Sequence, residues 1–308
     1  MIYTVTLNPS LDYIAYTSDI RYGKTNRSHD ERIIPGGKGL NVSIVLNRLG
    51  EKTTAIAFSG GFTGEHLKNL LKESGVDCDF IEVEGATTRI NVKMVTDRVT
   101  EMNGSGLTFT EKEKSALIEK IRNLNKDDLL VLSGTLPKGV DTNFYAKLME
   151  AAPCETVLDT NGWALLEGLK FKPLFIKPND EEMGDILGIE NPGEKDIYES
   201  AVKLQKLGAR NVLISLGKDG GALLTEDGTF VTSKAAEIDS NVSSYTVGAG
   251  DSMVAGFIHA LNIFSDPLDQ LEYALCMGTS SVVSPFLAEK ETAEKLFQSL
   301  KGNTDGNL

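Results

Sequence analysis

The chain has 308 residues, with 31 Lys and Arg against 44 Asp and Glu, a formal net charge of −13 and 41% hydrophobic residues. This length and apolar content suffice for a full hydrophobic core and exclude a disordered chain. The acidic balance argues against broad contact with nucleic acid or an anionic membrane, because both bind basic surfaces. No secretory pattern, no apolar stretch of membrane-spanning length and no clustering of the three cysteines is present, so we expect a cytoplasmic protein.

Apolar runs rich in β-branched residues alternate with segments of helical periodicity along most of the chain. The runs predict strands at 2–7, 53–58, 129–133, 156–159, 174–177 and 211–216. The periodic segments predict helices at 39–49, 64–73, 111–123, 143–151 and 200–207, with mostly helical structure after residue 250. This alternation is typical of βα units and therefore of a mainly parallel sheet covered by helices.

Two segments, residues 12–34 and 87–102, interrupt this rhythm. In the second, the run from Thr88 to Val95 alternates polar and apolar side chains, which predicts an antiparallel sheet with one exposed face. We expect both segments to form a small lid within a single domain of residues 1–308.

The first chemical motif is Pro35-Gly-Gly-Lys-Gly-Leu-Asn41, directly before a predicted amphipathic helix. Its glycines permit close backbone approach to a ligand, and the start of the helix offers unpaired N–H groups to an anion. An ordinary capping turn would have the same composition. However, residues 21–48 hold six Lys or Arg against two acidic residues, a local charge of +4. The motif therefore favours an anion site, to which Lys38 adds a charge and Asn41 adds donors and acceptors.

The second motif, Thr246-Val-Gly-Ala-Gly-Asp-Ser252, also leads into a predicted helix. The backbone N–H groups of Gly248, Ala249 and Gly250 would converge on one point and form an anion hole. Asp251 in this place has two explanations. It caps the helix, as Asp often does, or it is a general base that takes a proton from a substrate hydroxyl while the N–H groups stabilise a phosphoryl group in transfer. We favour the second explanation.

Two further motifs end predicted strands, where α/β proteins place ligand-binding loops. In Lys177-Pro-Asn-Asp-Glu-Glu182, Asn179 and Glu182 would share one side of a first helical turn and reach a magnesium ion through water. An acidic first turn also stabilises a helix by itself, so this motif alone leaves both interpretations open. The loop Ser215-Leu-Gly-Lys-Asp-Gly220 has the flexibility to carry a nucleotide.

Two residues in the predicted lid region suit a sugar phosphate. Asp12, after the first strand, has a short carboxylate that can accept hydrogen bonds from two sugar hydroxyls. Arg89, on the alternating strand, is placed to bind a phosphate from the lid side. The commoner nucleotide signatures, the P-loop and G-x-G-x-x-G, do not occur.

With these motifs in this order through almost its whole length, the chain resembles the ribokinase-like carbohydrate kinases, the PfkB family. The segments Asn8–Asp12, Asn26-Arg27 and Thr100–Gly104 look most like the 1-phosphofructokinase and tagatose-6-phosphate kinase branch. The minor 6-phosphofructokinases of the family typically carry Gly at the place of Lys38 and Arg near the place of Glu101.

The resemblance implies a three-layer α/β/α sandwich with a mostly parallel sheet and a small β-sheet lid, and a homodimer formed through the lid. It implies phosphorylation of a ketohexose phosphate with ATP and Mg²⁺, foremost fructose 1-phosphate to fructose 1,6-bisphosphate. Tagatose 6-phosphate is the alternative substrate, and a non-catalytic sugar-phosphate sensor is the remote alternative.

The resemblance also implies roles for individual residues. Asp251 is the base, beside the anion hole of Gly248, Ala249 and Gly250. The sugar phosphate is held by Asp12, Lys24, Arg27, Gly37, Lys38, Asn41 and Arg89. The nucleotide is bordered by Asn179, Ser215, Gly217 and Gly220, and Glu182 holds the metal through water, whereas the adenine pocket near residues 276–283 matches too loosely to name residues. We expect the basic residues to make one positive cleft in an acidic shell.

Overall fold

The computed structural model describes residues 1–188, 194–238 and 247–304, and Thr246 of the second glycine motif lies outside them. The strands are β1 Ile2–Thr6, β2 Ser10–Tyr16, β3 Asp30–Gly36, β4 Thr53–Ser59, β5 Asp77–Cys78, β6 Ile81–Glu82, β7 Arg89–Val95, β8 Val99–Met102, β9 Leu129–Ser133, β10 Glu155–Asp159, β11 Phe175–Ile176, β12 Asn211–Ser215, β13 Gly221–Leu224 and β14 Phe230–Ser233. The helices are α1 Lys38–Leu49, α2 Gly61–Glu73, α3 Glu111–Arg122, α4 Phe144–Ala151, α5 Gly162–Leu169, α6 Asp180–Leu187, α7 Glu194–Leu207, α8 Ala249–Ile263, α9 Pro267–Val283 and α10 Lys290–Thr304. A short 3₁₀ turn, η1, spans Gly217–Asp219.

The main sheet runs in the order β14-β13-β12-β11-β10-β9-β1-β4-β5, with β6 attached to β4. Its strands are parallel from β5 to β12, while β13 and β14 are antiparallel additions at one edge. The predicted mainly parallel sheet is thus confirmed. The antiparallel edge was not predicted. The prediction rested on strands that alternate with helices, whereas β13 follows β12 and β14 follows β13 through short turns with no α-helix between them.

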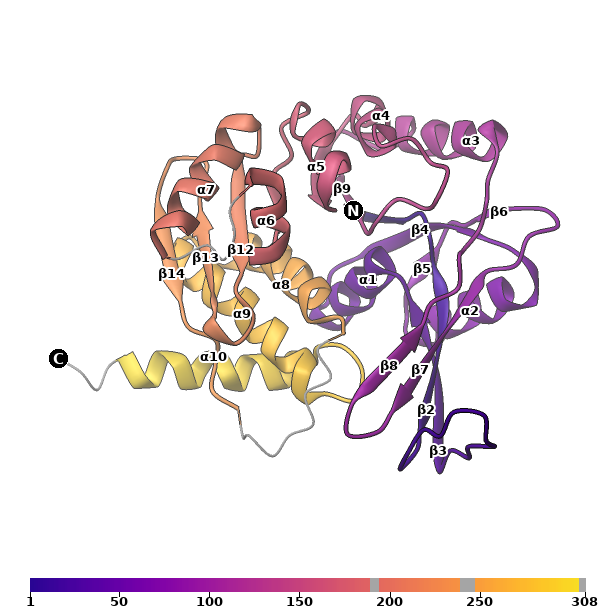
Figure 1. The fold of residues 1–308 in the computed structure, drawn as a ribbon. Coiled ribbons are helices and arrows are strands. Elements are labelled where there is room, and N and C mark those ends of the chain that lie inside the picture. The colour runs from indigo at the N-terminus through magenta and orange to yellow at the C-terminus, as the bar shows by residue number, and fades with distance from the viewer. Residues whose placement is uncertain (189–193, 239–246, 305–308) are drawn as a thin grey trace.

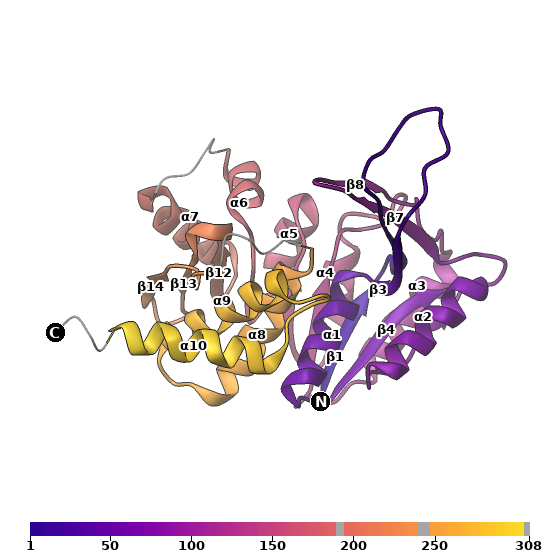
Figure 2. The ribbon, with the colours of Figure 1, turned by 90° about the horizontal axis from the view of Figure 1, so that it is seen from below.

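Helices cover both faces of this sheet, and the alternation of side chains along each strand decides what packs where. Leu130 and Leu132 of β9 belong to a core with α3, α4, α5 and α7, whereas Val131 between them faces the core of α1, α8 and α9. Figures 1 and 2 show the two helical layers with the sheet between them. The predicted three-layer α/β/α sandwich is confirmed. No helix in the described ranges is long and apolar enough to cross a membrane.

The lid is a separate four-stranded sheet in the order β3-β2-β7-β8 and projects from one end of the sandwich (Figure 1). Its central pair, β2 and β7, is parallel, although the sequence pattern predicted an antiparallel sheet. These strands come from two distant segments, so no hairpin turn forces them to be antiparallel. The face carrying Asp12 and Asn91 is buried toward the sandwich, and the opposite face exposes Ile33, Ile90 and Met102.

Candidate active site

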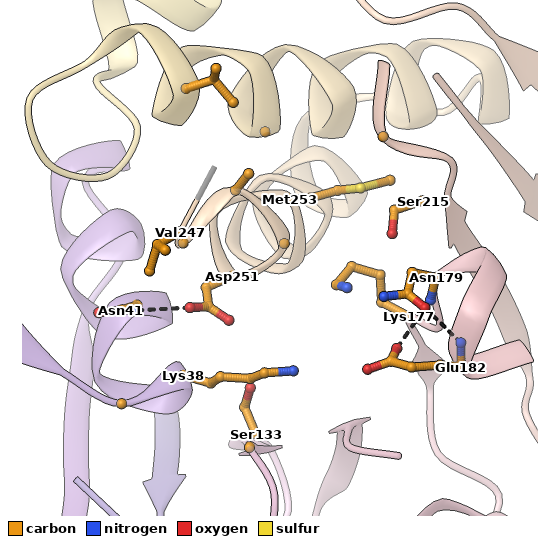
Figure 3. A pocket seen from close by; sticks show the side chains of 18 of the residues that line it. Lys38, Asn41, Ser133, Lys177, Asn179, Glu182, Ser215, Val247, Asp251 and Met253 are labelled. Atoms are coloured by element: carbon orange, nitrogen blue, oxygen red, sulfur yellow. Dashed lines mark hydrogen bonds between the residues drawn. The ribbon is translucent and has the colours of Figure 1, made fainter. Parts of the chain in front are cut away.

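One large cavity, of about 1230 Å³, lies between the lid and the carboxyl ends of the parallel strands. It is lined from β1 and the lid at one end to η1 and α9 at the other, and the first turns of α1 and α8 meet at its centre (Figure 3). The following residues with a predicted role line it: Asp12, Gly37, Lys38, Asn41, Arg89, Asn179, Glu182, Ser215, Gly217, Gly220, Gly248, Ala249, Gly250 and Asp251. Asp251 is among the lining residues contributed by the first turn of α8.

Asp251 lies in the first turn of α8 and is almost fully buried. The Nδ2 of Asn41 donates a 2.8 Å hydrogen bond to its Oδ2, so the first turns of α1 and α8 are linked at this point (Figure 3). Within the described ranges, Asp251 makes no hydrogen bond to the backbone of its own helix, so the cap interpretation lacks its characteristic bond. Burial raises the pKa of Asp251 from 3.8 to about 6, and the nearby Lys38 ammonium limits that rise. A carboxylate with such a pKa suits a general base near neutral pH.

The backbone around Gly248, where the sequence predicts an anion hole, starts helix α8 beside the cavity. Gly248 has φ 86°, in the left-handed region, and a Cβ there would lie 2.4 Å from Leu287 Cδ2. Helix α8 starts at Ala249, so the N–H groups of its first turn have no intrahelical acceptor. Lys177 Nζ approaches this turn and would lie 3.2 Å from a Cβ on Gly250. Backbone dipoles and an ammonium thus converge beside Asp251.

A buried carboxylate that no motif had identified, Asp159, lies behind the lining residues Lys38, Ser133 and Lys177. Its Oδ2 lies 3.6 Å from Lys38 Nζ and its Oδ1 lies 3.6 Å from Lys177 Nζ, and Ser133 Oγ donates a 2.9 Å bond to Oδ2. Burial disfavours the charged carboxylate, but Lys177 and Lys38 hold the pKa of Asp159 below its ordinary value. Asp159 in turn raises the pKa of Lys38. Asp159 therefore holds both ammonium groups in place and favours the charged form of Lys38.

Asn179 and Glu182 form a reciprocal capping box at the start of α6. The Glu182 N–H donates a 2.7 Å bond to Asn179 Oδ1, and the Asn179 N–H donates a 3.1 Å bond to Glu182 Oε2. The structural interpretation of this motif is thus correct, and Glu182 also lines the cavity. The described ranges contain no group of three or more His, Cys, Asp or Glu side chains that could hold a metal ion by themselves. Glu182 accordingly fits an ion held by one carboxylate, waters and substrate phosphates.

The end of the cavity away from the lid, where the sequence predicts the nucleotide, is bordered by Ser215 and the η1 turn. Gly220, with φ 101°, would place a Cβ 2.0 Å from the Ser233 carbonyl oxygen, so only glycine fits where this loop returns to β13. The far wall consists of residues that sequence reasoning could not name: Met253, Ala236, Leu275, Gly278, Thr279 and Val282. These small and apolar side chains suit a flat ring system.

At the lid end, Asp12 is already surrounded by donors. Ser10 Oγ and Asn91 Nδ2 donate to its Oδ1 at 2.7 and 2.9 Å, and Lys93 Nζ lies 2.9 Å from its Oδ2. Asn91 and Lys93 had no predicted role. They follow Arg89 by two and four residues, respectively, and therefore lie on the same face of β7 as Arg89. The carboxylate is rigidly oriented and its Oδ2 retains acceptor capacity for a ligand.

Arg89 does not extend freely into the cavity. Its Nη1 donates to the Gly104 carbonyl at 3.1 Å and its Nη2 donates to the Asn8 carbonyl at 3.0 Å. The guanidinium thus joins the lid to the end of β1. Burial lowers the pKa of Arg89, which is consistent with a partly desolvated structural cation.

Two predicted sugar ligands, Lys24 and Arg27, are not brought to the cavity. They lie in the exposed loop between β2 and β3, at the far end of the lid. The lining holds the basic Lys38, Arg89, Lys93, Lys177 and Lys218 and the acidic Asp12, Glu101, Asp180, Glu181, Glu182, Glu237 and Asp251. Among the described residues, the lining therefore carries more acidic than basic side chains and not the expected excess of positive charge, because most of the basic residues of the first glycine region lie on the lid.

Comparison with known proteins covers nearly the whole chain. The profile of the "pfkB family carbohydrate kinase" group matches residues 6–282. The chain is 36% identical over 304 residues to a 1-phosphofructokinase of Bacillus subtilis, with 98% of this chain and 99% of that protein covered. It is 35% identical over 293 residues to a D-tagatose-1-phosphate kinase of Bacillus licheniformis, with 94% and 95% covered. Phosphofructokinase-2 from Escherichia coli in complex with fructose-6-phosphate superposes with a TM-score of 0.89 at 28% identity, covering 97% and 99%.

Proposed function

The chain belongs to the pfkB family of carbohydrate kinases, and on that premise we propose that it transfers a phosphoryl group from ATP to fructose 1-phosphate, giving fructose 1,6-bisphosphate. The observation that carries this proposal is Asp251, a buried carboxylate with a pKa of about 6, placed beside an anion hole midway along the cavity. The similarity to 1-phosphofructokinases at 33–36% identity supports the choice of sugar.

In this mechanism, Asp251 accepts the proton of the 6-hydroxyl as that oxygen attacks the terminal phosphorus of ATP. The free N–H groups of the first turn of α8 and the Lys177 ammonium face the phosphoryl group and stabilise its charge during transfer. Asn41 keeps the ionised Asp251 oriented through its hydrogen bond. Lys38 lies between Asp159 and Asp251 at the point of transfer, which supports a role there and not on the phosphate that the sugar already carries.

ATP would lie along Asn179, Ser215 and η1, with its base against α9. Mg²⁺ fits beside Glu182, where it would be held through water, and it supplies charge neutralisation for the ATP phosphates when bound. Glu182 Oε2 is already engaged in the capping box, so Oε1 is the oxygen that faces such an ion.

A second candidate substrate is tagatose 1-phosphate, because a D-tagatose-1-phosphate kinase is 35% identical over 94% of the chain. Tagatose differs from fructose only in the configuration at C4, and a single displaced hydroxyl is the kind of difference that a few polar groups decide. The test is a panel of kcat/KM values for fructose 1-phosphate, tagatose 1-phosphate, tagatose 6-phosphate, fructose 6-phosphate and free fructose. A clear preference for either tagatose phosphate would replace the proposed substrate, and turnover of none of them would favour the non-catalytic sensor.

We also propose a homodimer formed through the lid. The outer lid face exposes Ile33, Ile90 and Met102 at 46%, 44% and 65%, so three of the four lid strands each leave a large apolar side chain in water. In such a dimer, Lys24 and Arg27 of one lid would reach the cavity of the other subunit. There they could bind the sugar phosphate, as the sequence predicts. Sedimentation of the wild type against Ile90→Asp tests the interface, and a wild-type monomer would exclude it.

A cytoplasmic location remains a prediction. It is supported by the use of ATP in this family and by three cysteines that are all free. Cell fractionation of the tagged chain tests it, and recovery outside the cytoplasm would contradict it.

A further inference from the structure

A buried carboxylate in α9, Glu272, connects three elements around the end of the cavity away from the lid. Only 6% of the residue is exposed. Ser233 Oγ, at the end of β14, donates a 3.2 Å hydrogen bond to Glu272 Oε1. Lys301 Nζ, in α10, lies 2.5 Å from Glu272 Oε2. None of these three described residues lines the cavity itself, so any effect they have on a ligand is indirect.

The elements that Glu272 joins carry the lining of this end. Leu275 and Thr279 follow Glu272 by three and seven residues, so they lie on the same face of α9, and both line the cavity. Residues 235 and 236, which come directly after the end of β14, line it too. The hydrogen bond from Ser233 to Glu272 therefore fixes the position of one lining segment relative to the other.

The backbone at Ser233 also supports the η1 loop. A Cβ on Gly220 would lie 2.0 Å from the Ser233 carbonyl oxygen and 2.6 Å from Lys234 Cα, so the loop returns in direct contact with the end of β14. Gly217 and Gly220 of this loop line the cavity. A displacement of Ser233 would thus be transmitted to the η1 loop as well as to residues 235 and 236.

The charge of Glu272 is compensated from α10. A buried carboxylate costs free energy unless its charge is paired, and Lys301 supplies that pairing while it also contacts Asp269 at 2.5 Å. The ionised carboxylate is a stronger acceptor for Ser233 Oγ than the Lys234 carbonyl, which lies at 3.5 Å. Without Lys301, Glu272 would have to bind a proton or turn toward water, and both changes would weaken its bond with Ser233.

We propose that Glu272 is a positioning residue for nucleotide binding, held by Lys301, and that through Ser233 it sets the spacing of the walls that receive the base. This inference rests on the proposed function for the identity of the ligand at this end of the cavity. Helix α10 thereby contributes to nucleotide affinity without touching the nucleotide. The effect concerns the base and not the phosphates, because Asn179 and the first turn of α8 belong to other segments.

The test measures binding to the full chain by calorimetry with two probes, each with Mg²⁺. One is a non-hydrolysable ATP analogue, and the other is inorganic tripolyphosphate, which lacks the base and the ribose. Ser233→Ala and Lys301→Met should each raise the Kd of the ATP analogue by about three- to tenfold, because residues that do not touch a ligand change its affinity by modest amounts. The Kd of tripolyphosphate should stay unchanged, whereas a general loss of stability would raise both values.

A double variant tests the route from Lys301 through Glu272. In Glu272→Gln the side chain keeps an oxygen that accepts the bond from Ser233, but it carries no charge and needs no ammonium. Adding Glu272→Gln to Lys301→Met should therefore restore most of the lost affinity for the ATP analogue. No recovery in the folded double variant would overturn this route.

Lys290→Met is the matched control, because it is the same substitution in α10, where Lys290 pairs only at 3.9 Å with Glu294 of the same helix. An equal loss of ATP-analogue affinity in this control, an equal loss of tripolyphosphate affinity, or an unchanged Kd in folded Ser233→Ala would each overturn the inference. Should Lys301→Met fail to fold, Ser233→Ala and the control decide alone. The expected changes in Kd without turnover of any sugar phosphate would refute the proposed function only.

Discussion

The hydrogen bond from Asn41 to Asp251 predicts a measurable change in the pH dependence of catalysis. Below its pKa of about 6, Asp251 is protonated and cannot accept the substrate proton, so kcat/KM should fall about tenfold for each pH unit further down. Asn41→Leu keeps a similar volume but removes the donor to Oδ2. Because that bond stabilises only the ionised carboxylate, its loss must raise the pKa of Asp251 and move the acid limb to higher pH.

The magnitude follows from the charge on the acceptor. A hydrogen bond to a charged group contributes about 1.5–3 kcal/mol, and about 1.4 kcal/mol corresponds to one pH unit. The midpoint of the acid limb should therefore rise by about one to two pH units, from near 6 toward about 7–8. Asn41 also lines the cavity, and on the proposed function it contacts the sugar. The plateau of kcat/KM should then fall as well, but a lower plateau does not move the midpoint.

The assay is kcat/KM for the preferred sugar phosphate from about pH 5 to 9, since this parameter reports groups of the free enzyme. A sugar phosphate has its own ionisation near pH 6, so the informative quantity is the ratio of variant to wild type at each pH, in which the substrate ionisation cancels. Asn47→Leu is the control, because Asn47 is also in α1 but donates to the Ser74 carbonyl, away from Asp251. A pH-independent ratio for Asn41→Leu, or the same shift in both variants, would refute the assignment of the limb to Asp251.

Four further predictions concern the same cavity. Lys177→Met should lower kcat about 10²- to 10³-fold with little change in nucleotide Kd, because its ammonium faces the phosphoryl group only in transfer; a loss confined to Kd would contradict this role. Gly248→Ala should lower both kcat and Tm, by about 1–2 kcal/mol in stability, because the new Cβ meets Leu287 at a positive φ, and unchanged values would show that the loop adapts freely. Glu182→Gln should raise the Mg²⁺ concentration for half-maximal activity without changing the KM of the sugar, and an unchanged Mg²⁺ requirement would remove Glu182 from the metal. Arg89→Met should cost about 1–3 kcal/mol in urea unfolding, because two carbonyls lose their donor, whereas an effect only on the KM of the sugar would restore its predicted role as a phosphate ligand.

What the sequence could predict is what local patterns encode. The two glycine motifs each precede a helix, and α1 and α8 begin where the patterns place them. Parallel strands then require that their carboxyl ends meet at one edge, so Asn179 after β11 and Ser215 at the end of β12 converge on one cavity although they are distant in the chain. These predictions needed only periodicity, glycine spacing and the geometry of βα units.

The remaining features depend on tertiary placement. Asp159 looks like any polar residue at a strand end, and only its contacts with Lys38 and Lys177 reveal its position under the transfer point. Lys24 and Arg27 are close to the first glycine motif in sequence, but β3 lies between them and the motif and carries the loop away. Proximity in sequence thus does not bring Lys24 and Arg27 to the cavity of their own chain, and Asp159 could not be identified because its partners are distant in sequence.

Three lysines of this cavity are paired with buried carboxylates, and among the described lining residues the basic side chains do not outnumber the acidic ones. Lys38 and Lys177 share Asp159, and Lys93 pairs with Asp12, so each of these ammonium groups is held in place by a buried carboxylate. A cavity with more acidic than basic residues can still bind phosphates for two reasons. The first turn of α8 offers backbone N–H donors, which carry no net charge. On the proposed function, the nucleotide also binds together with Mg²⁺, which the acidic first turn of α6 attracts. The net charge of −13 is a sum over all residues of the chain. It therefore does not predict the local field of the few backbone dipoles and ammonium groups beside Asp251. The acidic shell should therefore affect the rate at which anionic substrates arrive, which added salt would increase, far more than it affects kcat.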